Sequence, residues 1–145
     1  MKQILNDYPV VLEQQVRWGD EDSFQHVNNT VYFKYFEDAR IAYFDKIDAM
    51  VNMGETKIGP ILANARTDFR AALTYPDTIS IGCRISDVHE KKFTMQYVVY
   101  SHKMDCIAAE GDGLIVFLDY AKRKSCAIPA AVVAKIKQLE QTAGQ

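Results

Sequence analysis

The feature that most constrains the fold is a change in hydrophobic period near residue 50. Before it, apolar and aromatic side chains follow the three-and-four spacing of one helical face, at Tyr32, Tyr35, Phe36, Ala39, Tyr43, Ile47 and Met50. Asn28 or Asn29 is expected to start this helix, because asparagine is a preferred N-cap residue, and the region of Gly54 is expected to end it. The helix is predicted to be largely enclosed by other structure, because apolar residues also occur outside this face, at Val31, Phe33, Ile41 and Phe44.

After the helix, apolar residues recur at every second position, which is the spacing of strands. The cleanest alternation predicts a half-buried strand over 61–70. A turn is predicted at 75–78, where Pro76 suits the second turn position, and a polar hairpin connection is predicted at 89–92. The other predicted elements are strands over 10–18, 79–86, 93–100 and 106–118 and a closing helix over 131–139.

One early helix followed by antiparallel strands is an α+β pattern, since no strand–helix–strand alternation, internal repeat or low-complexity linker interrupts the chain. A long antiparallel sheet has an apolar face to cover, and only one long helix is available to cover it. We therefore expect the sheet to curl around the helix, in a single domain that spans residues 1–145. One helix leaves sheet edges exposed, which predicts the pairing of two or more chains.

Composition narrows the class of protein. With 145 residues, 48% of them hydrophobic and 25% charged, the chain suits a compact soluble domain with a core. A formal net charge of −2, without a long basic run, argues against a nucleic-acid-binding surface. No apolar run approaches the ~20 residues of a membrane span, and the N-terminal residues lack the apolar segment and cleavage site of a secretory signal. Three widely spaced cysteines fit reduced thiols, so a cytoplasmic location is expected.

The residues best suited to chemistry lie in the stretch from Arg17 to Arg40. Three acidic residues, Asp20, Glu21 and Asp22, lie in a predicted loop shortly before the predicted helix start. A helix N-terminus offers free backbone N–H donors, and a carboxylate beside it can act as a general base or a nucleophile. Asp22 has an alternative role as a loop carboxylate that caps the helix. Asp20 is expected to face away from Asp22 and to stabilise the loop.

Other kinds of catalytic site are disfavoured by the sequence. The three histidines, His26, His89 and His102, lack the spacing of metal ligands, so neither a metal nor a cofactor is expected. A serine hydrolase is disfavoured because the chain has no GxSxG motif. All three cysteines fall in or beside apolar strand patterns, where inert packing is normal.

The residues from Asp20 to Arg40 form the pattern D-x-D-x-x-x-H-V-N-N-x-x-Y-x-x-Y-F-E-x-A-R. This pattern resembles the signature of hotdog-fold acyl-CoA thioesterases of the 4-hydroxybenzoyl-CoA thioesterase type, and the predicted order of elements fits that family over nearly the whole chain. The resemblance implies a hotdog fold, in which a long central helix is wrapped by a curled antiparallel sheet. It also implies a homodimer or homotetramer with active sites at the subunit interface, and hydrolysis of an acyl or aroyl thioester to a free acid and coenzyme A.

The resemblance assigns roles to particular residues. Asp22 matches the catalytic carboxylate of the family, and Asn29 matches the residue at the helix start whose backbone N–H polarises the thioester carbonyl. The remaining implied contacts are to the substrate, at His26, Asn28, Tyr32 and Glu37, and to the phosphates of coenzyme A, at Lys91 and Lys92.

Each implied contact has a simpler alternative. His26 is better suited to a loop hydrogen bond than to catalysis, Asn28 suits capping of the helix, and Tyr32 suits the core, where it is also a candidate for the pocket wall. Glu37 and the two hairpin lysines can be solvated charges, and Glu37 can also be a subunit contact. Many relatives have glycine where this chain has Gln25, and some have an apolar residue in place of His26.

Three alternatives to acyl-CoA hydrolysis remain open. One is hydrolysis of a carrier-protein thioester. A second, a hotdog hydratase or dehydratase, is disfavoured because those relatives resemble one another through an Asp-x-Asn-Pro-x-His element, whereas the segment from Asp22 to His26 lacks the Asn-Pro pair and is one residue shorter. The third is a non-catalytic acyl-binding module, against which the intact Asp22 argues.

Overall fold

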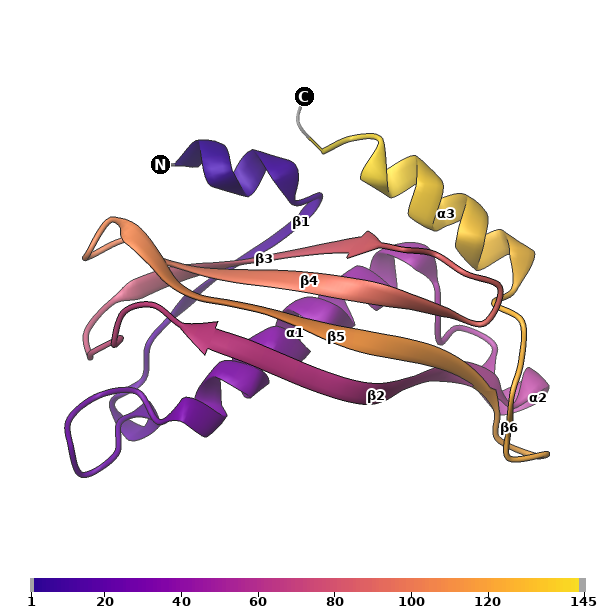
Figure 1. Ribbon diagram of the computed structural model, residues 1–145, viewed down its shortest axis with the longest axis horizontal. Coiled ribbons are helices and arrows are strands. Elements are labelled where there is room, and N and C mark those ends of the chain that lie inside the picture. Colours follow the sequence, from indigo (N-terminus) through magenta and orange to yellow (C-terminus); the bar gives the residue numbers. More distant parts are fainter. Residues whose placement is uncertain (1, 144–145) are drawn as a thin grey trace.

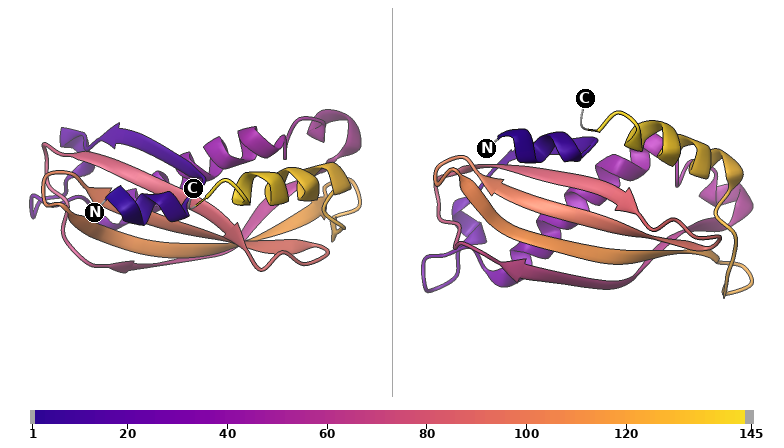
Figure 2. Two further views of the ribbon diagram at one scale, coloured as in Figure 1. Left: turned by 90° about the horizontal axis from the view of Figure 1, so that it is seen from above. Right: turned by 45° about the horizontal axis from the view of Figure 1, so that its top comes forward.

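The computed structural model describes residues 2–143 and shows one long helix held in the concave face of a curled antiparallel sheet (Figures 1 and 2). The strands lie in the order β1-β3-β4-β5-β2, and the short β6 pairs with β5. This is the α+β arrangement expected from the sequence. The elements in chain order are η1 (Lys2–Asp7), β1 (Val10–Gln15), η2 (Trp18–Asp20), α1 (Asn29–Ile47), α2 (Met53–Thr56), β2 (Ile58–Phe69), β3 (Thr78–Ser86), β4 (Lys92–Ser101), β5 (Cys106–Asp119), β6 (Lys124–Ser125) and α3 (Ala130–Glu140).

Helix α1 begins where the sequence predicts, because Asn28 is its N-cap and accepts a hydrogen bond from the Thr30 N–H. The helix ends at Ile47, since Asp48 adopts a left-handed conformation with φ 53°. The sequence places Met50 on the apolar face of this helix, and this part of the prediction is wrong. Met50 lies beyond the end of α1 and is 39% exposed. The buried residues of the helix are Tyr32, Tyr35, Phe36, Ala39, Tyr43, Phe44 and Ile47.

The sheet accommodates α1 through close aromatic packing. Phe36 of α1 stacks on Tyr97 of β4, with ring centroids 4.7 Å apart. Gly111 of β5 lies beneath the same ring, and a Cβ at this position would come within 2.7 Å of Phe36 and 2.6 Å of the Arg66 carbonyl oxygen. The absence of a side chain at Gly111 therefore lets helix and sheet approach each other.

In one chain, α1 is less enclosed than the sequence predicts. Phe33 and Ile41 lie on α1 and are 38% and 44% exposed. Residues of β2, the strand at one edge of the sheet, are exposed as well. The sequence predicts a half-buried strand over 61–70, but Ile61 and Leu62 of β2 are 42% and 40% exposed, and most of the strand is accessible on both faces. An apolar edge strand of this kind is a template for pairing with another chain.

The opposite edge of the sheet is formed by β1 and, beyond the end of β1, by the last residues of β3. Strand β1 is shorter than the predicted strand over 10–18, because the chain turns into η2 at Trp18, and it pairs with β3 only as far as Cys83. Beyond that point the Ile85 N–H donates to the Glu140 carboxylate of α3, at 3.0 Å. The closing helix thus protects the part of the β3 edge that β1 leaves open. None of the helices within residues 2–143 is long and apolar enough to span a membrane.

Candidate active site

The loop between η2 and α1 is a small antiparallel ladder. The Asn28 N–H donates to the Asp20 carbonyl oxygen, and the Asp22 N–H donates to the His26 carbonyl oxygen, each at 2.9 Å. Between these two bonds lies an antiparallel bridge that pairs residues 21 and 27. Near the tip, Gln25 has φ 63°, in the left-handed region where glycine carries no steric cost. We call residues 20–28 the acidic loop.

The acidic loop borders a cavity of about 400 Å³ at the start of α1. Its walls come from the tip of the loop, the first residues of the helix, and the segment that follows β2. Four of the predicted site residues line it together: Asp22, His26, Asn29 and Tyr32. The sequence does not place the other lining residues beside Asp22. They are Phe24, Val27, Phe69, Arg70, Ala71 and Ala72.

The Asp22 carboxylate is half-buried at this cavity. Its Oδ1 atom accepts a hydrogen bond from the Phe24 N–H at 2.9 Å, which fixes the orientation of the group. Its Oδ2 atom accepts no hydrogen bond from the residues that the structure describes. One oxygen therefore orients the carboxylate, and the other is available to a proton, a water or an electrophilic carbon.

The helix start supplies a complementary donor. Asn28 accepts hydrogen bonds from the Thr30 N–H at its side-chain Oδ1 and from the Val31 N–H at its carbonyl oxygen, both at 2.9 Å. The Asn29 N–H has no acceptor among residues 2–143, and Asn29 lines the same cavity as Asp22. A free N–H at a helix N-terminus stabilises negative charge on an oxygen that lies within hydrogen-bond distance of it.

Tyr32 forms a rigid wall of the cavity. Its side chain is buried, its hydroxyl donates to the Ala71 carbonyl oxygen at 3.4 Å, and it accepts a hydrogen bond from the Leu73 N–H at 3.2 Å. The ring packs edge-on against Phe69, with centroids 5.1 Å apart. Burial raises the pKa of Tyr32, which further favours the protonated hydroxyl.

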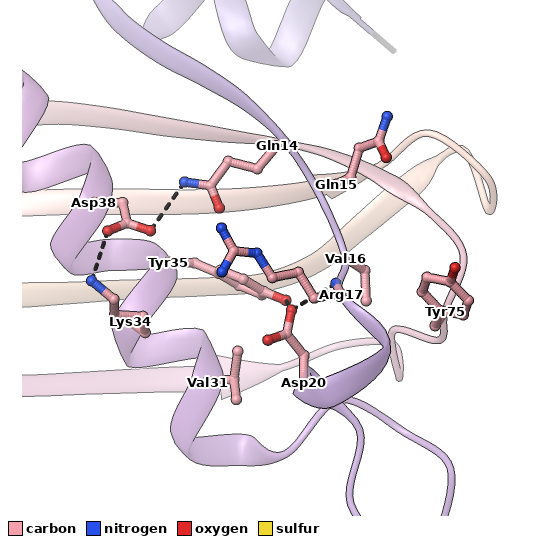
Figure 3. A pocket seen from close by; sticks show the side chains of 10 residues that line it. All are labelled: Gln14, Gln15, Val16, Arg17, Asp20, Val31, Lys34, Tyr35, Asp38 and Tyr75. Carbon is pink, nitrogen blue, oxygen red and sulfur yellow. Dashed lines mark hydrogen bonds and ion pairs between the residues drawn. The ribbon is translucent and has the colours of Figure 1, made fainter.

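A larger cavity, of about 800 Å³, lies on the other side of the acidic loop, between β1 and α1 (Figure 3). Asp22 is not among its lining residues, but Asp20 is. The carboxylate of Asp20 accepts hydrogen bonds from the Tyr35 hydroxyl at 3.0 Å and from the Arg17 N–H at 2.9 Å. Asp20 and Asp22 therefore serve different cavities, as expected for an Asp20 that faces away from Asp22.

The remaining chemistry-bearing residues form no metal site. Within the described part of the chain, no group of three or more His, Cys, Asp or Glu side chains is arranged to hold a metal ion. Burial raises the pKa of the Cys83 thiol well above its usual value, which leaves this cysteine as an inert core residue.

Residues 16–136 match the sequence model of the thioesterase-like superfamily, which covers the acidic loop, the whole sheet from β2 to β6 and most of α3. The chain belongs to the thioesterase-like superfamily. This membership confirms the family and the thioester hydrolase class expected from the motif, and with them the hotdog arrangement of helix and sheet.

Several known proteins resemble the chain to different extents. Long-chain acyl-CoA thioesterase FadM of Escherichia coli is 22% identical over 86% of this chain and 95% of its own. A Thermus thermophilus thioesterase, whose crystal structure contains coenzyme A and zinc, is 28% identical with a TM-score of 0.80, covering 93% of this chain and 96% of that one. The uncharacterised protein YsmA of Bacillus subtilis is 30% identical over 57% of this chain, and the matched part spans 55% of its length.

Not all of the predicted substrate contacts of this superfamily member meet at the Asp22 cavity in one chain. Glu37 lines a separate cavity of about 310 Å³ between α1 and the sheet, and forms an ion pair with Lys34 at 3.1 Å. Lys91 and Lys92 are exposed in and beside the connection between β3 and β4. That connection lies at the opposite end of the sheet from the acidic loop (Figure 1). One chain therefore separates the proposed phosphate contacts from the proposed carboxylate.

Proposed function

We propose that the protein is an acyl-CoA thioesterase in which Asp22 attacks the thioester carbon or activates water, while the Asn29 N–H polarises the carbonyl. The observation that carries this proposal is the shared cavity. A carboxylate with one free oxygen and a helix N-terminus with one free N–H line the same space of about 400 Å³. These are the two groups that hydrolysis of an activated ester requires.

The chemistry places modest demands on each group. If Asp22 acts as a general base, it takes a proton from water as the water oxygen attacks the carbonyl carbon. The C–S bond then breaks, the acyl group leaves as a carboxylic acid, and the thiolate takes up a proton to give free coenzyme A. A positioned base contributes roughly 10²–10⁴-fold to the rate. One N–H placed at the developing oxyanion contributes about 2.7–4 kcal/mol.

A nucleophilic Asp22 is the alternative route. The carboxylate oxygen then forms a mixed anhydride with the acyl group and releases the thiolate, and water hydrolyses the anhydride in a second step. The free Oδ2 atom suits either route. His26, Asn28 and Tyr32 are proposed to contact the substrate around the reacting bond, since His26 and Tyr32 line the cavity and Asn28 adjoins Asn29.

Coenzyme A is the proposed thiol carrier, because the Thermus thermophilus relative holds coenzyme A and FadM is an acyl-CoA thioesterase. The functional unit is proposed to be a homodimer or homotetramer of single-domain chains in the cytoplasm. The exposed apolar edge of β2 supports a second copy as the partner. A second copy can also bring Lys91, Lys92 and Glu37 of one chain toward the Asp22 cavity of another, where their proposed substrate contacts require them.

The experiment that tests this function is a hydrolysis screen with the purified wild-type protein. Short, long and aromatic acyl-CoA thioesters are each incubated with it, and release of free thiol is measured alongside the same acyl groups on a carrier protein. We expect thiol release well above the uncatalysed rate for at least one acyl-CoA. The proposal is wrong if every thioester is bound without turnover, which indicates an acyl-binding module, or if only the carrier-protein thioesters are cleaved.

A further inference from the structure

We propose that Asp20 is a positioning residue for thioester hydrolysis, and that its hydrogen bond to Tyr35 holds the acidic loop so that Asp22 and the Asn29 N–H share one cavity. This inference rests on the proposed function. Its starting observation is that hydrogen bonds of Asp20 connect three parts of the molecule: the segment that follows β1, the buried face of α1 and the base of the acidic loop.

The first connection is made by the side chain. One carboxylate oxygen, Oδ2, accepts both the Tyr35 hydroxyl at 3.0 Å and the Arg17 N–H at 2.9 Å, as Figure 3 shows. Tyr35 is 3% exposed and belongs to the buried face of α1, so its position is set by the core. Burial raises the pKa of Tyr35, and the hydrogen bond to Asp20 raises it further, so the hydroxyl remains a donor.

The second connection is made by the main chain. The Asp20 carbonyl oxygen accepts the Asn28 N–H at 2.9 Å, which closes the base of the acidic loop. Asn28 is the N-cap that precedes Asn29, and Asp22 is two residues after Asp20. The distance between the proposed base and the proposed carbonyl-polarising N–H is therefore set across the two strands of a ladder whose base is Asp20 and Asn28.

The rest of the loop is anchored on its other side. The Val27 N–H donates to the Leu73 carbonyl oxygen at 2.9 Å, and the Glu21 carboxylate accepts the Tyr75 N–H at 2.9 Å. Leu73 in turn donates its N–H to Tyr32, which packs against Tyr35 with ring centroids 6.0 Å apart. Two neighbouring tyrosines of α1 therefore hold the acidic loop. Tyr32 acts through Leu73, which binds Val27, and Tyr35 acts through its hydrogen bond to Asp20.

Two substitutions separate the role of the Asp20 acceptor oxygen from the role of its negative charge. Asp20→Asn retains an oxygen that can accept from the Tyr35 hydroxyl and the Arg17 N–H, while it removes the negative charge two residues from Asp22. Asp20→Ala removes the acceptor and leaves the Tyr35 hydroxyl without its partner in a buried position. A misplacement of about 1 Å at the reacting groups costs on the order of 100-fold in rate.

The test compares kcat and KM for Asp20→Ala, Asp20→Asn, Tyr35→Phe and the Asp20→Ala/Tyr35→Phe double variant, each normalised to folded protein by circular dichroism. We expect kcat to fall about 100-fold in Asp20→Ala with KM within about twofold of wild type, and Asp20→Asn to keep kcat within about threefold. The double variant should match Asp20→Ala, because both changes break the same contact. Asp38→Ala is the matched control and should keep kcat near the wild-type value. Asp38 lines the cavity of about 800 Å³ together with Asp20, but its hydrogen bonds come from Lys34 and Gln14 and not from the acidic loop.

Hydrogen exchange supplies a readout that does not depend on turnover. In Asp20→Ala, the Asn28 amide should exchange faster than in wild type, while amides of β4 and β5 keep their protection. The inference is overturned if Asp20→Ala retains wild-type kcat, or if Asp20→Asn loses as much as Asp20→Ala, since charge would then matter and position would not. Should Asp20→Ala not fold, wild-type kcat in Tyr35→Phe overturns it equally. A wild-type protein without thioesterase activity contradicts the proposed function, and slow Asn28 exchange in Asp20→Ala separately contradicts the positioning role.

Discussion

Asn28 shows how much a single side chain contributes to this site. Its Oδ1 atom accepts the Thr30 N–H, which is one of the donors that a helix start leaves without an intrahelical partner. Its own N–H is held by Asp20. The next residue, Asn29, is left with a free N–H because the cap reaches past it to Thr30. The capping geometry and the proposed carbonyl-polarising donor are therefore produced by the same two residues.

At this scale we predict that Asn28→Ala lowers the free energy of unfolding by about 1 kcal/mol, the usual cost of losing an N-cap. The matched variant Asn28→Asp keeps an oxygen at the capping position and should stay within about 0.5 kcal/mol of wild type. Urea unfolding followed by circular dichroism measures both. Equal stability of Asn28→Ala and wild type would show that the cap does not stabilise α1.

Several residue roles were accessible to the sequence and others were not. Asn28 and the face from Tyr32 to Ile47 could be predicted, because capping and helical periodicity are local properties. The bond between Asp20 and Tyr35 could not, since it depends on where the core places Tyr35. The grouping of Phe69 and Arg70 with Asp22 was equally out of reach, because it requires knowing which loop the end of β2 faces.

Among the elements, β2 departs most from its sequence pattern. Its alternation of apolar and polar residues predicts one buried face, yet Ile61, Leu62 and Phe69 are 42%, 40% and 45% exposed. The pattern predicts the strand correctly, but in the single chain no other element covers the face that the pattern marks as buried. The exposed Phe33 and Ile41 on α1 extend this apolar surface onto the helix. A second copy of the chain is the proposed cover.

The prediction at the element scale is that Leu62→Lys shifts the protein to monomers and lowers thioesterase activity at least tenfold. A lysine in an apolar subunit contact leaves a buried charge without a partner, which destabilises the assembly. Sedimentation velocity measures the oligomeric state at the concentration used for the assay. Met104→Lys is the control, because Met104 is 38% exposed in the turn between β4 and β5, away from β2. A wild-type protein that hydrolyses thioesters while it sediments as a monomer would contradict the role proposed for β2.

At the scale of the whole molecule, the core is rich in buried tyrosines. Tyr35, Tyr43 and Tyr97 are each at most 3% exposed. Burial raises the pKa of all three, and in Tyr43 a hydrogen bond to the Glu140 carboxylate raises the pKa further. The pKa of Tyr97 is raised to about 12. The folded protein therefore keeps these phenols protonated at pH values where the unfolded chain ionises them, since an unperturbed tyrosine has a pKa of about 10.

We predict that stability is unaffected by these groups below about pH 10 and falls as the pH rises above it. A raised folded-state pKa means that the folded state binds more protons than the unfolded state, so the free energy of unfolding decreases with pH. The slope is up to roughly 1.4 kcal/mol per pH unit for each phenol that stays protonated. Urea unfolding between pH 8 and about pH 11.5 measures it. Tyr43→Phe should reduce the slope, and a slope equal to that of the wild-type protein would contradict this account.

The arrangement of the whole molecule also explains why part of the site could not be predicted from the sequence. The α+β class and the curled sheet followed from one helix and a run of alternating strands. The placement of Lys91 and Lys92 relative to Asp22 did not, because it depends on the direction of every strand between them. The hairpin and the acidic loop lie at opposite ends of the sheet (Figure 1), and the proposed assembly of chains is the arrangement that would bring them to one substrate.

The most direct test of the proposed mechanism is the turnover number of Asp22→Asn on the best acyl-CoA substrate of the wild-type protein. The change retains the shape and the Oδ1 acceptor for Phe24 but removes the negative charge. We predict a fall in kcat of about 10²–10⁴-fold, with an unchanged circular dichroism spectrum and unfolding midpoint. A variant that folds normally and hydrolyses the same thioester at the wild-type rate would contradict the proposal that Asp22 carries the reaction.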